Sequence, residues 1–218
     1  MKLISKKGFD FFCSDNFVFF IDRDENDKDK FFKTDLDKLS EISIEEYTNI
    51  KFGKSWRSLD SAYTECIHLD NGEYLTCIFD ESIIFHHDID GNKIKKYNIG
   101  QFNNGFDNIY GITLDRNGKL WIVQPTSHYI GQFSLDTEEE LFRIGGDFEN
   151  PDTFDHPEQV RAFGDFVFVC DMGNNRICQI NIDTKELTEY KKFDEQAWEY
   201  GQFKTKEIVK LNSGLYEL

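Results

Sequence analysis

Residues 164–183, GDFVFVCDMGNNRICQINID, contain the pattern that decides the fold. Residues 166–170 are apolar and rich in aromatic and β-branched side chains, which suits a strand that packs on both faces. Gly, Asn and Asn follow at 173–175, and these residue types tolerate the positive φ angles of a tight hairpin turn. Residues 176–182 alternate loosely between apolar and polar, as in a strand nearer to solvent. The stretch therefore predicts a β-hairpin.

The same unit recurs along the chain. Four turn glycines mark it at intervals of 46, 46 and 50 residues: Gly72, Gly118, Gly164 and Gly214. A second set of turn residues closes the third strands at intervals of 46 and 47: Asp90, Asp136 and Asp183. Repeats of this length, with four strands each, are typical of β-propeller blades. The sequence therefore predicts an all-β fold, with a single β-propeller domain over residues 1–218 and four antiparallel strands in each blade.

The number of blades depends on how the ring closes. Four full units can be assigned, but the last piece, residues 207–218, contains only two strands. An open blade edge invites pairing with another chain. We therefore expect the N-terminal segment, residues 2–5, to complete the last blade, which gives five blades. The alternative is an open array that closes by dimerisation through the short last blade or against a partner. Residues 47–50, between the first two units, either extend an outer strand or form a short helical turn.

The charge of the chain restricts its partners. The 41 acidic and 25 basic residues give a net charge of −16. This excess disfavours nucleic acids and anionic membrane surfaces, because both are recognised through basic faces. A basic protein or free cations would be attracted instead. Solubility alone is the alternative explanation.

The cysteines and the N-terminus indicate the cellular compartment. There are five cysteines, an odd number without Cys-x-x-Cys spacing, and each lies in a strand-like run where a thiol acts as a small apolar group. Residues 1–7 lack the apolar region of a secretory signal, and no run approaches the roughly 20 apolar residues of a membrane span. We therefore expect a cytoplasmic protein.

Two units carry a resemblance to known families. Residues 110–123, followed by 129–133, resemble the repeat of streptogramin-lyase-type propellers, and residues 156–157 with 169–177 resemble the NHL repeat. Both families are β-propellers, so the resemblance implies the same fold. NHL propellers serve as protein- or RNA-binding modules and as enzymes, and streptogramin-lyase-like propellers include a metal-assisted lyase. None of the catalytic residues of that enzyme can be matched to a position here, so no catalytic residue is assigned.

The candidate binding residues lie in the segments that enter the first strand of each blade. In a propeller these segments converge on one face around the central channel. Large aromatic side chains with a polar group are typical of protein-binding hot spots. The alternative is that they pack between blades. The candidates are Trp56, Arg57, Phe106, Tyr110, His156, Glu158, Trp198 and Tyr200.

The signals for metal binding or acid–base chemistry are weak. None of the five histidines belongs to a recognised zinc pattern. His156 could form an acid–base pair with Asp155 or Glu158. The fold also resembles lactonase-type propellers, whose axial divalent ion would here require oxygen ligands such as Asn108, Glu158 and Glu207. The spacing of these residues does not match that pattern, so we assign no metal ligand and no cofactor.

The sequence therefore favours a non-catalytic, protein-binding propeller. One concrete hypothesis is a cytoplasmic, immunity-type protein that neutralises a basic partner. The alternative is a metal-assisted lyase or lactone hydrolase with a site on the propeller axis and a divalent cation such as Ca²⁺ or Mg²⁺.

Overall fold

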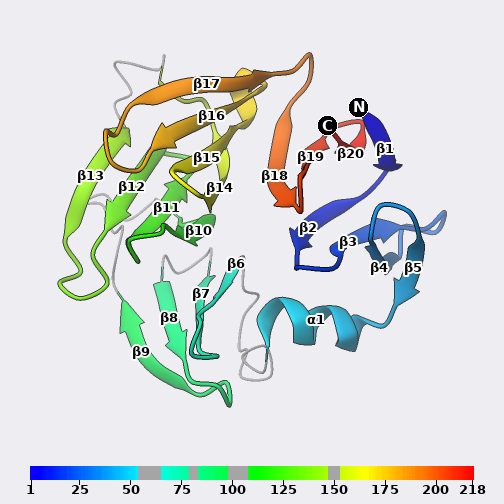
Figure 1. The fold of residues 1–218 in the computed structure, drawn as a ribbon, viewed down its shortest axis with the longest axis horizontal. Coiled ribbons are helices and arrows are strands. Elements are labelled where there is room, and N and C mark those ends of the chain that lie inside the picture. The colour runs from blue at the N-terminus through cyan, green and yellow to red at the C-terminus, as the bar shows by residue number, and fades with distance from the viewer. Residues whose placement is uncertain (54–64, 79–82, 98–107, 147–152) are drawn as a thin grey trace.

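The computed structural model describes residues 1–53, 65–78, 83–97, 108–146 and 153–218. Within these ranges, five four-stranded sheets stand in a ring around a central axis (Figure 1). Every pair of neighbouring strands in a sheet is antiparallel, so the predicted five-bladed β-propeller is confirmed.

Blades 1 to 4 each use four consecutive strands, from the axis outward. Blade 1 contains β2 (Phe9–Cys13), β3 (Val18–Arg23), β4 (Asp29–Thr34) and β5 (Leu39–Ile42). Blade 2 contains β6 (Glu65–His68), β7 (Tyr74–Ile78), β8 (Ile83–His87) and β9 (Lys93–Tyr97). Blade 3 contains β10 (Gly111–Leu114), β11 (Leu120–Gln124), β12 (Tyr129–Phe133) and β13 (Glu140–Gly145). Blade 4 contains β14 (Pro157–Phe163), β15 (Phe166–Asp171), β16 (Arg176–Asn181) and β17 (Leu187–Lys192).

Blade 5 is shared between the two ends of the chain. It consists of β18 (Ala197–Phe203), β19 (Lys206–Leu211), β20 (Gly214–Glu217) and, outermost, β1 (Lys2–Ser5). β1 pairs antiparallel with β20, with Lys2 opposite Glu217 and Leu3 opposite Tyr216. The expected closure by the N-terminal segment is therefore confirmed. The alternative of an open array is wrong, because β1 covers the edge of β20. The expected count of two C-terminal strands is also wrong, since residues 197–203 form a third, β18.

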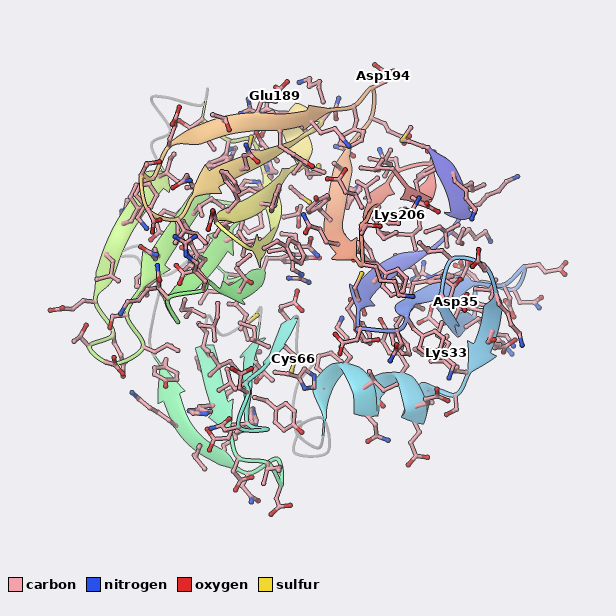
Figure 2. The ribbon with its side chains drawn as sticks, in the orientation of Figure 1. Lys33, Asp35, Cys66, Glu189, Asp194 and Lys206 are labelled. Atoms are coloured by element: carbon pink, nitrogen blue, oxygen red, sulfur yellow. The ribbon has the colours of Figure 1, made fainter. Side chains whose placement is uncertain are left out.

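Apolar side chains fill the spaces between neighbouring blades. Leu75 and Ile84 of blade 2 pack in one cluster with Ile112 and Ile122 of blade 3, and all four are buried. The cluster between blades 1 and 5 is built in the same way, from Val18, Phe20, Ile208 and Leu215 among others. Removing such side chains from water favours the closed ring at about 25 cal/mol per Å² of apolar surface. Charged side chains such as Glu189 and Asp194 lie at the outer rim of the ring (Figure 2).

Three of the four predicted turn glycines lie in the inner hairpins of their blades. Gly214 does not: it begins β20, the third strand of blade 5, and the inner hairpin of that blade turns at Lys204, with a φ of 56°. Gly72, Gly118 and Gly164 have φ angles of 84°, 67° and 58°, and Asn175 has a φ of 55°. These angles lie in the left-handed region that Gly and Asn tolerate. Arg176, next to Asn175, donates a hydrogen bond of 2.7 Å to Asp171 and one of 2.8 Å to the Thr153 carbonyl.

Between blades 1 and 2 the chain forms a helix, α1 (Ile44–Phe52), so residues 47–50 are helical and do not extend an outer strand. Ser43 caps its N-terminus by accepting a hydrogen bond of 3.1 Å from the Glu46 N–H. Near the other end of the helix, Lys51 is buried and forms an ion pair with Asp10. The helix therefore brings a cation to the propeller axis. In the described part of the chain no helix is long and apolar enough to cross a membrane.

We predict that removing residues 2–5 destabilises the ring. The deletion exposes the edge of β20 and removes a few ladder hydrogen bonds, each of which contributes about 0.5–1.5 kcal/mol. Urea unfolding should show a loss on the order of 2–4 kcal/mol, and light scattering should show association through the open edge. Lys2→Ala is the control, because it keeps the strand and removes only the exposed side-chain contacts of Lys2 with Glu217 and with the Leu36 carbonyl. A deletion variant as stable as the control would contradict this account of closure.

Candidate functional site: an axial cavity

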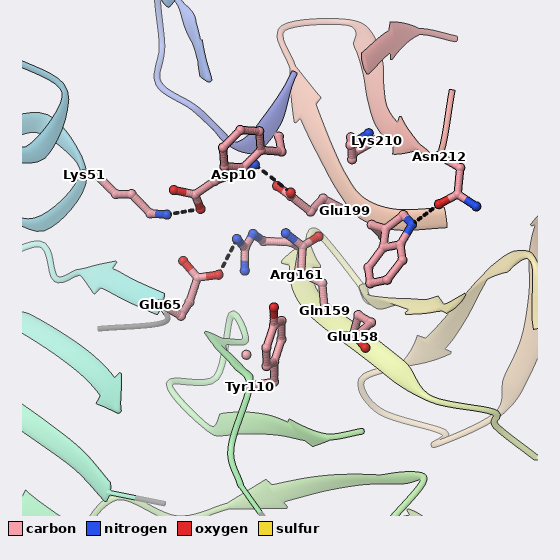
Figure 3. Close-up of a pocket in the computed structure, with 13 residues that line it drawn as sticks. Asp10, Lys51, Glu65, Tyr110, Glu158, Gln159, Arg161, Glu199, Lys210 and Asn212 are labelled. Atoms are coloured by element: carbon pink, nitrogen blue, oxygen red, sulfur yellow. Dashed lines mark hydrogen bonds and ion pairs between the residues drawn. The ribbon is translucent and has the colours of Figure 1, made fainter. Parts of the chain in front are cut away.

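The five inner strands, β2, β6, β10, β14 and β18, begin on the same face of the ring, and their first residues surround a cavity of about 530 Å³ (Figure 3). A second cavity, of about 500 Å³, is lined by residues at the ends of the same strands. We call the first one the axial cavity. Its charged lining consists of four acidic and three basic residues: Asp10, Glu65, Glu158, Glu199, Lys51, Arg161 and Lys210. Its aromatic lining consists of Phe9, Tyr110 and Trp198.

The floor of the axial cavity is made of two ion pairs. Lys51, Glu65 and Arg161 line both cavities and therefore separate them. Arg161 Nη2 lies 2.5 Å from Glu65 Oε2, and Lys51 pairs with Asp10 (Figure 3). Burial opposes the charge of Lys51, but the carboxylates of Asp10 and Glu65 outweigh this effect and raise its pKa. Both cations are therefore charged, and each has a carboxylate partner.

Two side chains at the start of inner strands fix the backbone of the next blade. Glu199 of β18 accepts hydrogen bonds of 2.8 Å from both the Asp10 and the Phe11 N–H of blade 1. Gln159 of β14 accepts one of 2.7 Å from the Tyr200 N–H of blade 5. A register shift next to each residue, between 157 and 159 and between 197 and 199, places both side chains in equivalent positions. The polar lining therefore also holds the ring together.

Glu199 has an unusual affinity for protons. Desolvation, followed by the neighbouring Asp10 carboxylate, raises its pKa to about 7, although Lys51 and the two N–H donors act in the opposite direction. A carboxyl group with this pKa exchanges its proton near neutral pH.

The rim of the axial cavity carries the carboxylate of Glu158. In the described part of the chain, Glu158 is half-buried and has no hydrogen-bond or ion-pair partner; desolvation raises its pKa, while His156 lowers it. Trp198 donates a hydrogen bond of 2.6 Å from Nε1 to Asn212 (Figure 3). Lys210 donates one of 2.6 Å to the Leu211 carbonyl, and desolvation lowers its pKa.

The structure brings together three of the candidate residues: Tyr110, Glu158 and Trp198 all line the axial cavity. Tyr200 does not line it. Its ring is buried and contributes to the second cavity, and its hydroxyl donates a hydrogen bond of 2.9 Å to Glu207. His156 lies beside the axial cavity, where Nδ1 is 2.7 Å from Asp155. Trp56, Arg57 and Phe106 lie outside the described residues.

The oxygen ligands considered for an axial ion do not meet. Of Asn108, Glu158 and Glu207, only Glu158 lines the axial cavity. Glu207 accepts hydrogen bonds from Tyr190 and Tyr200 and pairs with Lys191 at 2.8 Å.

Sequence reasoning missed the residues of the cavity floor. Asp10 and Glu65 lie at or near the start of their inner strands, so aligning the strand starts would have indicated them. Arg161 lies in the middle of β14, and Lys51 lies on α1, where no repeat pattern applies.

We predict that breaking the floor pair is more harmful than removing both partners. Arg161→Met leaves the Glu65 carboxylate desolvated and unpaired, which should cost about 3–5 kcal/mol in urea unfolding. Adding Glu65→Gln to this variant should restore most of that loss, because a neutral side chain needs no counter-charge. A double variant no more stable than Arg161→Met would contradict this role of the pair.

We also predict a pH effect from Glu199. Its pKa in the folded chain, about 7, lies above the ordinary value of 4.5, so the folded state binds this proton more tightly. The resulting stability is present below about pH 4.5 and is lost as the pH rises to 7, by an amount on the order of 2–3 kcal/mol. The free energy of unfolding should therefore fall more steeply over this range in the wild type than in Glu199→Gln. If the free energy of unfolding changes with pH equally in both proteins, Glu199 does not have this raised pKa. The charged groups around Glu199, namely Asp10, Lys51, Arg161 and Lys210, are unchanged in this comparison.

Comparison with known proteins identifies the fold. No protein-family model and no curated protein matches the chain. A solved streptogramin B lyase superimposes with a TM-score of 0.54 at 18% identity, over 100% of this chain and 70% of the lyase. Selenomethionine-substituted virginiamycin B lyase from Staphylococcus aureus gives 0.52 at 16% identity, over 100% and 72%. A structure described as YCF48 bound to D1 peptide gives 0.57 at 9% identity, over 94% and 60%. At such identities the likeness concerns the fold alone, and the chain is a five-bladed β-propeller similar to the streptogramin lyases.

Proposed function

We propose that this propeller is a non-catalytic binding module that takes a cationic side chain of a basic protein partner into the axial cavity. The observation that supports this most directly is Glu158. Its half-buried carboxylate has no partner in the described part of the chain and shares the cavity with the aromatic rings of Tyr110 and Trp198. A Lys or Arg side chain would give Glu158 its missing counter-charge.

The other carboxylates of the axial cavity have partners. Asp10 and Glu65 neutralise Lys51 and Arg161, and Glu199 is held by two N–H groups, so among the described lining residues Glu158 is the carboxylate available to a ligand. The aromatic rings add cation–π attraction, which contributes about 0.5–2 kcal/mol when the cation is desolvated. The net charge of −16 would steer a basic protein toward the molecule and speed its association.

A metal-assisted lyase or lactone hydrolase on the axis has less support. The Asp10 and Glu65 carboxylates at the floor are occupied by an ammonium and a guanidinium group, which leaves them unavailable as ligands of a divalent ion such as Ca²⁺ or Mg²⁺. We therefore propose no cofactor for the axial cavity. An immunity-type protein that neutralises a cationic toxin remains the concrete form of the binding hypothesis. A cytoplasmic location is part of it, in keeping with the five unpaired thiols.

We predict that capture of a basic partner depends on the rim of the axial cavity. Immobilised wild-type protein should retain a basic protein from its own cell lysate at low salt and release it at high salt, because salt screens the attraction. Glu158→Gln and Trp198→Ala should each weaken this retention at least about tenfold, the loss of about 1.4 kcal/mol expected when a hot-spot contact is removed.

The matched control is Glu186→Gln, which removes the same charge at an exposed position outside the cavity lining. Retention by Glu186→Gln should equal that of the wild type. If no basic protein is retained at either salt concentration, or if all three variants retain it equally, the proposal is wrong.

A further inference from the structure

We infer that His128, Asp155 and His156 form a binding site for a zinc-type transition-metal ion at the junction of blades 3 and 4. His128 lies in the turn between β11 and β12, and the other two residues immediately precede β14. One ligand atom from each of the three side chains lies within 4.8 Å of the others. This site lies outside the lining of the axial cavity and does not depend on the function proposed for it.

The three side chains already face one another. His156 Nδ1 is 2.7 Å and His128 Nδ1 is 3.7 Å from the same oxygen of Asp155. The two imidazole rings meet edge to face, with centroids 4.7 Å apart. Ligand atoms around a tetrahedral zinc ion, with bonds of about 2.0–2.1 Å, are roughly 3.4 Å apart. Because His128 Nδ1 also contacts the Phe154 carbonyl oxygen, the site would close by rotation of the Asp155 and His156 side chains toward Nε2 of His128.

A hydrogen bond selects the ligating nitrogen of His128. Its Nδ1 lies 3.0 Å from the carbonyl oxygen of Phe154, so Nδ1 carries the proton and donates it. The lone pair of this tautomer is on Nε2. Metal-binding histidines commonly donate their second nitrogen to a backbone carbonyl in this way, which fixes the ring and its tautomer. Phe154 is buried, so the carbonyl group that accepts this hydrogen bond is held in place.

Hydrogen bonds already hold the backbone of the site in place without a bound ion. The Asp155 N–H donates a hydrogen bond of 2.7 Å to the buried Asp171 carboxylate, and the Asp155 carbonyl accepts one of 2.8 Å from Gly173. His128 and His156 have left-handed φ angles of 56° and 47°. Such angles cost of order 1 kcal/mol or more for a residue other than Gly or Asn.

The turn itself does not require a histidine. Asn175 stands directly before the third strand of blade 4, as His128 does in blade 3, and its φ is nearly the same, at 55°. An asparagine therefore fits this backbone at least as well. The imidazole of His128 thus adds chemistry that the turn does not need.

The donor set selects the type of ion. Two imidazoles and one carboxylate suit Zn²⁺, Co²⁺, Ni²⁺ or Cu²⁺, whereas Ca²⁺ and Mg²⁺ prefer oxygen ligands throughout. Three protein ligands leave a fourth position for water. A bound ion would cross-link blade 3 to blade 4 and would lie two residues along the chain from Glu158, at the side of the axial cavity.

The test is a titration of the EDTA-treated full chain with Zn²⁺, followed by calorimetry, and with Co²⁺, followed by visible absorption. We expect one strongly bound ion per chain and a cobalt spectrum without a thiolate charge-transfer band. His128→Asn and His156→Asn should each weaken Zn²⁺ binding at least about tenfold, because asparagine keeps the backbone conformation and removes the ligand. His86→Asn is the matched control, since His86 contacts Glu73 in blade 2.

A second measurement needs no variant. In the wild type, Zn²⁺ should shift the imidazole NMR signals of two histidines and leave those of the other three unchanged. The inference is overturned if Zn²⁺ binding is absent, if it is unaffected in both His128→Asn and His156→Asn, if His86→Asn weakens it equally, or if the cobalt spectrum shows thiolate ligation.

Discussion

Convergence of five inner strands on one axis is the constraint on which the rest of the structure depends. It places the first residues of β2, β6, β10, β14 and β18 around one space, where water is partly excluded and an isolated charge is unfavourable. The chain satisfies this constraint with the pairs Lys51–Asp10 and Arg161–Glu65 and with the two N–H groups that hold Glu199. The Glu199 contacts join the neighbouring blades 5 and 1, the Arg161–Glu65 pair links blades 4 and 2 across the axis, and Lys51 holds α1 against blade 1. The polar axis therefore contributes to closure of the ring, as the apolar clusters between blades do.

The fold could be predicted because its signals are local and repeated. Gly72, Gly118 and Gly164 keep their spacing since blades 2 to 4 need the same inner hairpin, and the incomplete last unit required a strand from the other end of the chain. The predicted completion of blade 5 by residues 2–5 followed from counting strands alone.

The candidate site was predicted only in part, because its decisive contacts are distant in sequence or depend on register. Glu65 and Arg161 are 96 residues apart and meet only when the ring has closed. The register shift between 197 and 199 decides that Glu199, and not Tyr200, faces the axial cavity, since successive strand residues point to opposite faces. Lys51 is carried by a helix that interrupts the repeat. His128 and His156 come together in the same way, from a turn in one blade and the entry to the next, without any spacing that a sequence motif could reveal.

The central claim is that the partner docks on the face where the inner strands begin. Amide hydrogen exchange of the wild-type protein, alone and with its captured basic partner, tests this claim most directly, because it requires no substitution. The account predicts slower exchange on binding in peptides that cover residues 110–111, 158–160 and 212–213, around the mouth of the axial cavity. Protection confined to the hairpin turns at the opposite ends of the inner strands, residues 14–17, 116–118 and 164–165, would contradict it.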